Sequence, residues 1–142
     1  YIDKVEGDES IVRYSLIGRR LPLHSTAIGK VLLAYQAPNK MELFLKNYHY
    51  QQQTDNTIIN ETVFREELEK VKEQGYALVD QENEQGVRCA AVPIFNGKGY
   101  VLAALSISTL VSPVNDQELH LFIDLLKTSC KDLSEQMRYV DE

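Results

Sequence analysis

Cysteine is scarce in this chain: among 142 residues there are only Cys89 and Cys130. Neither belongs to a CxxC pair, so the sequence has no dense disulfide framework, and we expect a reducing, cytoplasmic compartment. No stretch approaches the roughly 18 uninterrupted apolar residues of a membrane-spanning helix. The sequence therefore fits a reduced compartment better than a secreted, disulfide-built one, and it predicts no membrane-spanning helix.

Several motifs that carry chemistry are also missing. The sequence contains no GxGxxG, GxxxxGK[ST], GxSxG or HExxH, so nothing supports a nucleotide-binding, serine hydrolase or zinc protease reading. The three histidines, His24, His49 and His120, are scattered without the spacing of a ligand pair. We expect no cofactor and no resident metal.

Positive charge is in deficit. Lys and Arg total 15 against 21 Asp and Glu, which gives a formal charge of −6 and a pI near 5.1. Proteins that bind nucleic acid or anionic membranes through their whole surface carry a basic footprint, which this chain lacks. We therefore expect no direct nucleic-acid or membrane partner for these residues.

We expect one globular domain over residues 1–142. The length of 142 residues is typical of a single domain, and 44% of the residues are hydrophobic, as in an average globular protein. The chain opens on Tyr1-Ile2-Asp3, which is neither a signal peptide nor a start methionine. We expect it to be a piece of a longer protein.

The hydrophobic patterns predict an α+β domain built on an antiparallel sheet, in the order β-β-α-α-α-β-β-β-α. The strands expected are Tyr1–Val5, Ile11–Ile17, Tyr76–Val79, Val87–Phe95 and Tyr100–Leu110. The last two are apolar enough to be central strands covered on both faces, and Asn96-Gly97-Lys98-Gly99 joins them as a hairpin.

Helices are expected in four places. Ser25 or Thr26 caps the first, which Pro38 stops, and a capping box at Asn39–Glu42 opens a short second helix. Phe64, Leu68 and Val71 mark a third helix, which Gly75 closes. Asn115–Glu118 caps a long final helix with an apolar stripe at Leu119, Phe122, Leu126, Cys130, Leu133 and Met137.

Three places combine polar groups with an apolar setting. The helix start after Leu21-Pro22-Leu23-His24 leaves backbone N–H groups free to bind a carboxylate or phosphate, or is simply a capped helix end. Ser106 and Ser108 share one face of an apolar strand. Cys89 is a pocket-lining thiol, or a small buried hydrophobe like most lone cysteines.

Three carboxylates, Asp80, Glu82 and Glu84, come just before the strand of Cys89. Their ordinary interpretation is a solvated turn.

These segments together resemble the effector-binding domain of IclR-family bacterial transcription regulators. The resemblance covers essentially the whole chain and rests on four blocks in order: Gly18–Lys30, Glu73–Tyr76, Gly86–Phe95 and Ala104–Ser108. It implies a GAF-like fold with a small-molecule pocket, in a regulator that binds its operator only through an N-terminal winged helix-turn-helix domain absent from this chain. It also implies a homodimer or homotetramer.

The resemblance implies a pocket built from Thr26, Ala27 and Ile28, Cys89, and Ser106 and Ser108, with Val79 and Asp80 beside it. Many relatives carry two acids after the Gly-Tyr block, whereas this chain has Val79 followed by Asp80. The lost acid would have accepted a bond from a ligand hydroxyl. The IGRR and STAIGKVLLA motifs are most similar to those of regulators of sugar-acid catabolism. We therefore expect a small carboxylate effector, such as a sugar acid or keto acid.

Three rival functions stay open at this point. Cys89 could be a nucleophile with His24 as its base, which would make the chain an enzyme. His24, Cys89 and Asp80 could form a metal- or thiol-based sensor. The domain could also serve oligomerisation alone, without a ligand.

Overall fold

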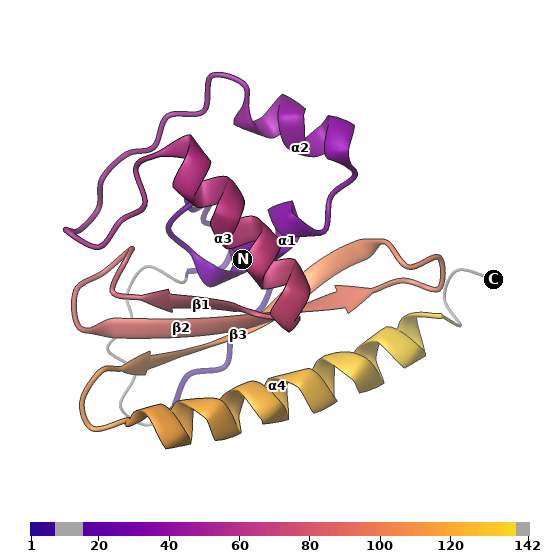
Figure 1. Cartoon of the computed structure of the whole chain (residues 1–142). Helices are drawn as coiled ribbons and strands as arrows, with labels where there is room; N and C mark the ends of the chain where they lie inside the picture. Colours follow the sequence, from indigo (N-terminus) through magenta and orange to yellow (C-terminus); the bar gives the residue numbers. More distant parts are fainter. Residues whose placement is uncertain (8–15, 139–142) are drawn as a thin grey trace.

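The computed structural model describes residues 1–7 and 16–138 (Figure 1). The described part holds a three-stranded antiparallel sheet in the order β1-β2-β3, whose strands are β1 (Ala77–Asp80), β2 (Val87–Phe95) and β3 (Val101–Leu110). On one side of this sheet lie α1 (Ala27–Ala34), α2 (Pro38–Leu45) and α3 (Glu61–Gln74), with α1 against the strands and α2 farthest from them, and the other side is covered by α4 (Asp116–Met137). The predicted α+β class with an antiparallel sheet packed against helices is confirmed.

The core has two layers because successive side chains of a strand point to opposite faces of the sheet. Cys89 and Ala91 of β2 pack towards α1 and α3, where Val31, Phe64 and Leu68 are fully or almost fully buried. Ala90 and Val92 pack towards α4 in the second layer, against Leu119, Ile123, Leu126 and Cys130. β2 is therefore buried on both faces, as its continuous apolar run predicted.

The N-terminal part differs from the prediction. Tyr1–Val5 is not assigned as a strand: Gly18 N–H donates to the Tyr1 carbonyl (2.8 Å) and the Tyr1 amino group donates to the Arg19 carbonyl (3.2 Å), but these bonds do not continue into a ladder with other described residues. Most of the predicted strand Ile11–Ile17 lies outside the described residues. β3 was expected to be central, yet it is an edge of the sheet that the structure describes.

Helix ends follow local chemistry where a side-chain cap is present. Asn60 caps α3 by accepting from Val63 N–H, and Gly75 ends that helix with φ 80°. Asn115 and Glu118 form the predicted capping box of α4, although Ile123 rather than Phe122 completes its buried stripe. The capping box predicted at Asn39–Glu42 is wrong, because α2 starts one residue earlier, at Pro38 itself.

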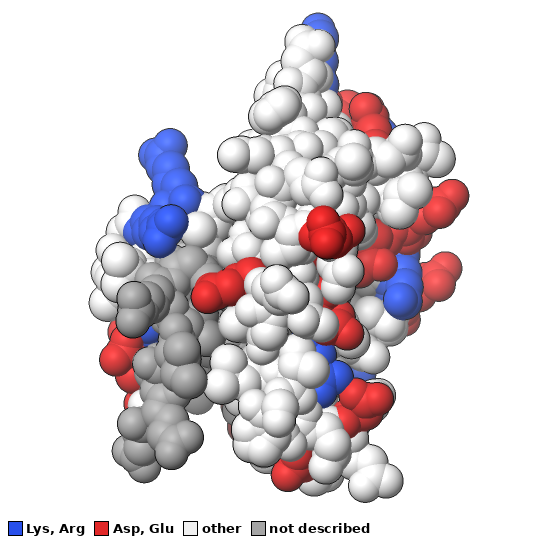
Figure 2. All heavy atoms as spheres, turned by 90° about the vertical axis from the view of Figure 1, so that its left-hand side faces the viewer, with Lys and Arg blue, Asp and Glu red and all other residues white. Residues whose placement is uncertain are grey.

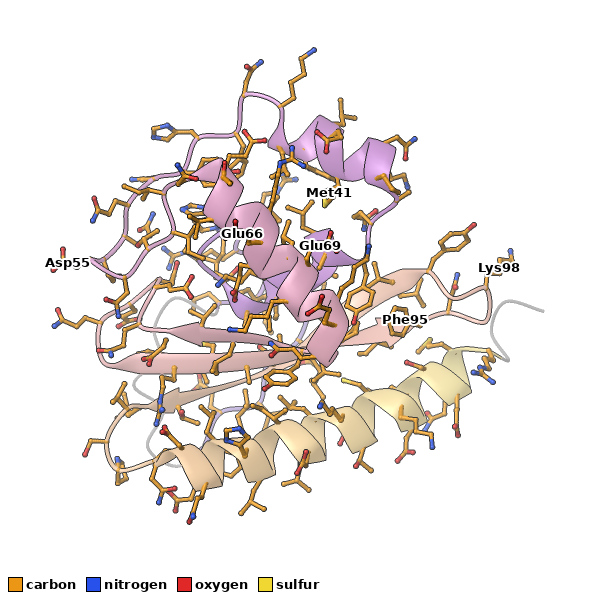
Figure 3. The ribbon with its side chains drawn as sticks, viewed as in Figure 1. Met41, Asp55, Glu66, Glu69, Phe95 and Lys98 are labelled. Carbon is orange, nitrogen blue, oxygen red and sulfur yellow. The ribbon has the colours of Figure 1, made fainter. Side chains whose placement is uncertain are left out.

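The hairpin between β2 and β3 reaches past α1 and α3, with Phe95 and Lys98 near its end (Figure 3). Glu66 and Glu69 lie on the outward side of α3 (Figure 3). On the face shown in Figure 2, acidic side chains outnumber scattered basic ones, in agreement with the acidic composition. Within residues 1–7 and 16–138, no helix is long and apolar enough to cross a bilayer.

Candidate functional site

A groove of about 630 Å³ follows the outer edge of β3, bounded by residues 1–7 on one side and by the start of α4 on the other. We call it the β3 groove. Its lining includes Ser106 and Ser108 from the face of β3 that looks towards α1, together with Ile28 of α1. It also includes Thr109 and Phe122 from the α4 side, so the groove wraps around the strand edge.

Cys89 lies beside the serines. It is paired in register with Ser108, and its Sγ atom is 3.2 Å from the Ser108 Oγ atom. Tyr1, which lines the groove, is affected by the same thiol. Burial and, to a lesser extent, the charge of the nearby Cys89 raise the pKa of the Tyr1 hydroxyl to about 12. The structure thus brings Ile28, Cys89, Ser106 and Ser108 together.

Thr26 and Ala27 are not among the residues that line the groove. The Thr26 hydroxyl caps α1 by accepting from Gly29 N–H (3.2 Å), and it donates to the Pro22 carbonyl (2.7 Å). The first intrahelical bond runs from Lys30 N–H to the Thr26 carbonyl, so the N–H groups of Ala27 and Ile28 precede it. The hydroxyl of Thr26 is already engaged, whereas the start of α1 keeps its partial positive charge.

Val79 and Asp80 lie on opposite faces of the sheet. Val79 is paired with Cys89 and packs in the same layer, almost fully buried. Asp80 is exposed and is paired with Arg88 on the opposite face of the sheet, because consecutive strand residues alternate. The geometry therefore leaves Asp80 away from Cys89, Ser106 and Ser108.

The interpretation of the acidic segment as a solvated turn is wrong for Glu82. Its carboxylate accepts from Nζ of Lys30 (2.9 Å), which also donates to Glu67 (3.2 Å), and the Lys30 side chain is fully buried. Burial raises the pKa of Glu82, and Lys30 opposes that rise. Sequence reasoning missed Lys30, although a lysine among the apolar positions of a helix is the one signal that could have found it.

The turn that carries Glu82 is also tied to its neighbours. Ser25 Oγ donates to Asn83 (3.0 Å), and Thr57 Oγ1 donates to the Glu82 carbonyl (2.7 Å). Thr54 Oγ1 donates to the carbonyl of Gln81 (2.6 Å). The turn between β1 and β2 is thus fastened to the start of α1 and to the loop before α3.

His24 is a buried structural residue. Its Nε2 faces the Gln51 carbonyl (3.0 Å) and must donate, so its Nδ1 accepts from the Tyr48 hydroxyl (3.0 Å). That hydroxyl in turn accepts from Leu23 N–H (3.0 Å). Both ring nitrogens are engaged, so His24 is in no position to serve Cys89 as a base or to bind a metal.

Burial lowers the pKa of His24 below its ordinary 6.5, which makes the stability of the domain depend on pH. Between the lowered pKa and 6.5 the unfolded chain binds more protons than the folded one, so the free energy of unfolding falls as pH falls through this window. Urea unfolding over a pH series should show this slope in the wild type and lose it in His24→Gln. Tyr48→Phe is the control, which keeps the imidazole and hence a slope of the same sign. An unchanged slope in His24→Gln would contradict the assignment.

Within the described residues no group of three or more His, Cys, Asp or Glu side chains could hold a metal ion. The metal sensor suggested from His24, Cys89 and Asp80 fails on geometry as well, because His24 is engaged and Asp80 lies on the other face. What remains at the β3 groove is a set of hydroxyl groups and an apolar wall, with the charged residues Asp3 and Lys4 on the lining and the Cys89 thiol beside Ser108.

An α+β fold with an open groove lined by hydroxyl and apolar side chains is the architecture expected of a domain that binds a small molecule. The chain belongs to the IclR family: the family described as bacterial transcriptional regulator IclR C-terminal matches residues 1–135. It is therefore the effector-binding domain of a transcription regulator and not an enzyme, which removes the nucleophile hypothesis.

Two curated relatives are similar to it over nearly the whole chain. HTH-type transcriptional regulator XynR of Escherichia coli (strain K12) is 46% identical over 98% of this chain and 55% of the relative. HTH-type transcriptional regulator KdgR of the same organism is 40% identical over 99% of this chain and 54% of the relative. The chain thus spans about half the length of these relatives.

Solved structures of IclR-family proteins have a similar fold. The Thermotoga maritima IclR crystal structure has a TM-score of 0.91 and 39% identity, covering 98% of this chain and 56% of that one. The inducer-binding domain of the PobR transcription factor from Acinetobacter, a double mutant in complex with 3-hydroxybenzoic acid, has a TM-score of 0.82 and 32% identity. That match covers 89% of this chain and 74% of that one.

Proposed function

We propose that this domain senses a small carboxylate, such as a sugar acid or a keto acid, in the β3 groove. The observation that carries the proposal is the convergence of Ser106 and Ser108 from β3 with Ile28 at the start of α1, and with Cys89 next to Ser108. Hydroxyl donors and the positive end of a helix are suited to a carboxylate.

A related domain with a bound acid supports a carboxylate, and the net charge of this chain says how such a ligand must be held. The related PobR domain holds 3-hydroxybenzoic acid, a small hydroxylated carboxylate. The formal charge of this chain is −6, so an anionic effector gains nothing from the overall field and must be held by local donors. The groove supplies such donors, with Val79 and Ala27 packed behind them.

For the whole protein, we propose a cytoplasmic homodimer or homotetramer with a GAF-like sensor of residues 1–142 and a separate DNA-binding domain. The effector would alter operator binding, with repression as the simplest outcome. To do so it must bind one arrangement of the protein better than the other, because a ligand with equal affinity for both shifts nothing.

The double variant Ser106→Ala with Ser108→Ala should weaken effector binding by about 10- to 100-fold, since each lost hydrogen bond contributes roughly 1 kcal/mol. A thermal-shift screen of sugar acids and short keto acids against the domain identifies the binder. Isothermal titration calorimetry then compares its affinity for wild type and variant.

Ser129→Ala is the matched control, because Ser129 is exposed on α4 and lies outside the groove lining. The control should bind like the wild type. If no acid raises the melting temperature, or if the double variant binds as well as the control, the carboxylate proposal is wrong. The absence of any binder together with a stable dimer or tetramer would favour the oligomerisation module instead.

A further inference from the structure

Two buried polar atoms next to the β3 groove have no hydrogen-bond partner in the described structure: Nε of Arg88 and Oγ1 of Thr109. The two residues are directly opposite one another in the register of β2 and β3. Side chains at opposed positions share a face of the sheet, with Cβ atoms about 4.5–5.5 Å apart. One oxygen atom placed between them can bond both.

The surroundings hold this pair in place. Arg88 is nine-tenths buried, and its two terminal nitrogens donate to the Val114 carbonyl (2.6 Å) and to the Asp116 carboxylate (2.5 Å). Its guanidinium is therefore fixed against the start of α4 with only Nε unused. Thr109 itself lines the β3 groove, on the side that Val114 and Phe122 close.

Unsatisfied buried polar groups are rare in folded proteins because they cost stability, and those that persist often serve binding. The charge of Arg88 is already neutralised by Asp116, and Glu118 lies in the same helical turn. A second anion is therefore poorly suited to this place. A neutral hydroxyl fits, since it can accept from Nε and donate to Oγ1.

We propose that Arg88 Nε and Thr109 Oγ1 form a second polar subsite of the β3 groove, which binds a hydroxyl of a polyhydroxylated carboxylate. The inference rests on the proposed function, in which the carboxylate end lies at Ser106 and Ser108. These serines and Thr109 are on opposite faces of β3, so the ligand must extend around the strand edge. A three-carbon keto acid is too short to engage both ends, whereas a six-carbon sugar acid carries hydroxyls along its length.

Thr109→Val tests the subsite, with gluconate and pyruvate as the long and short probes in isothermal titration calorimetry. Valine keeps the shape and removes the hydroxyl, so we expect gluconate affinity to fall about 10-fold, the effect of one hydrogen bond, and pyruvate affinity to stay unchanged. The melting temperature without ligand should stay equal or rise, because the lost hydroxyl had no partner. A purely structural threonine would instead lower the melting temperature and weaken both probes.

Thr128→Val is the matched control: Thr128 is exposed on α4, and its hydroxyl donates to the Asp124 carbonyl (3.1 Å). It should leave both affinities unchanged. Equal gluconate affinity in Thr109→Val and wild type, or equal weakening of both probes, overturns the subsite. If the serine double variant loses gluconate while Thr109→Val does not, the subsite alone fails. If no acid of the thermal-shift screen binds the wild type, the proposed function fails, and the subsite fails with it.

Discussion

Replacing Lys30 with methionine should lower the free energy of unfolding by about 3–5 kcal/mol, the range found when one partner of a buried ion pair is removed. The Lys30 ammonium is fully buried and bonds the carboxylates of Glu67 and Glu82. Methionine fills a similar volume but leaves two carboxylates facing each other without a cation. The turn between β1 and β2 loses one of its attachments to α1 at the same time.

Urea unfolding of the variant at neutral pH measures the loss. Lys72→Met is the control, because Lys72 is exposed on α3 and its replacement should change stability by less than about 0.5 kcal/mol. Adding Glu82→Gln to Lys30→Met should recover part of the loss, since it removes one of the two stranded charges. A Lys30→Met variant as stable as Lys72→Met would show that the ion pair is not buried as described.

The buried cluster of Lys30 with its two carboxylates could not be predicted from the sequence. Lys30, Glu67 and Glu82 come from α1, α3 and the turn before β2, so their meeting depends on packing between distant segments. Nothing local at Glu82 distinguishes it from a solvated turn residue. The sequence also could not predict that Arg88 Nε and Thr109 Oγ1 lie opposite each other without partners, because their placement depends on the register of β2 and β3.

Features set by neighbouring residues were predictable. The Asn115–Glu118 capping box and the glycine at the end of α3 are local chemistry, and β2 has the predicted bounds Val87–Phe95. The box at Asn39–Glu42 failed because Pro38 is itself suited to the first position of a helix. Tyr1–Val5 is not a strand in the described structure, and most of its predicted hairpin partner, Ile11–Ile17, lies outside the described residues.

Part of the candidate site could be predicted from the sequence. Ser106 and Ser108 share a face by strand periodicity, and their meeting with Cys89 follows from the hairpin between β2 and β3. The same periodicity separates Val79 from Asp80, so only Val79 shares the face of Cys89. That the groove extends to Thr109 on the other face follows from β3 being an edge of the described sheet.

Replacing Gly29 with alanine should destabilise the domain by about 2–3 kcal/mol, at the upper end for overpacking a tight site. A Cβ atom at this position would lie 2.6 Å from both the Cα atom and the carbonyl oxygen of Leu23, and 2.7 Å from Oγ1 of Thr26. Two of these atoms belong to the backbone, which gives way less easily than a side-chain end. Alanine is the better helix former by about 1 kcal/mol, but this gain is smaller than the expected cost of the clash.

The substitution also acts on the proposed site. Relief of the clash must shift Leu23 or the start of α1, and the cap formed by Thr26 on Gly29 N–H opens with it. Effector affinity should therefore fall together with stability, whereas the serine double variant lowers affinity alone. Ser129→Ala is again the control and should change neither quantity, since Ser129 is exposed on α4 and lies outside the groove lining. Urea unfolding and calorimetry with the same carboxylate separate the two effects, and a Gly29→Ala variant more stable than wild type would contradict the close approach of Leu23 to α1.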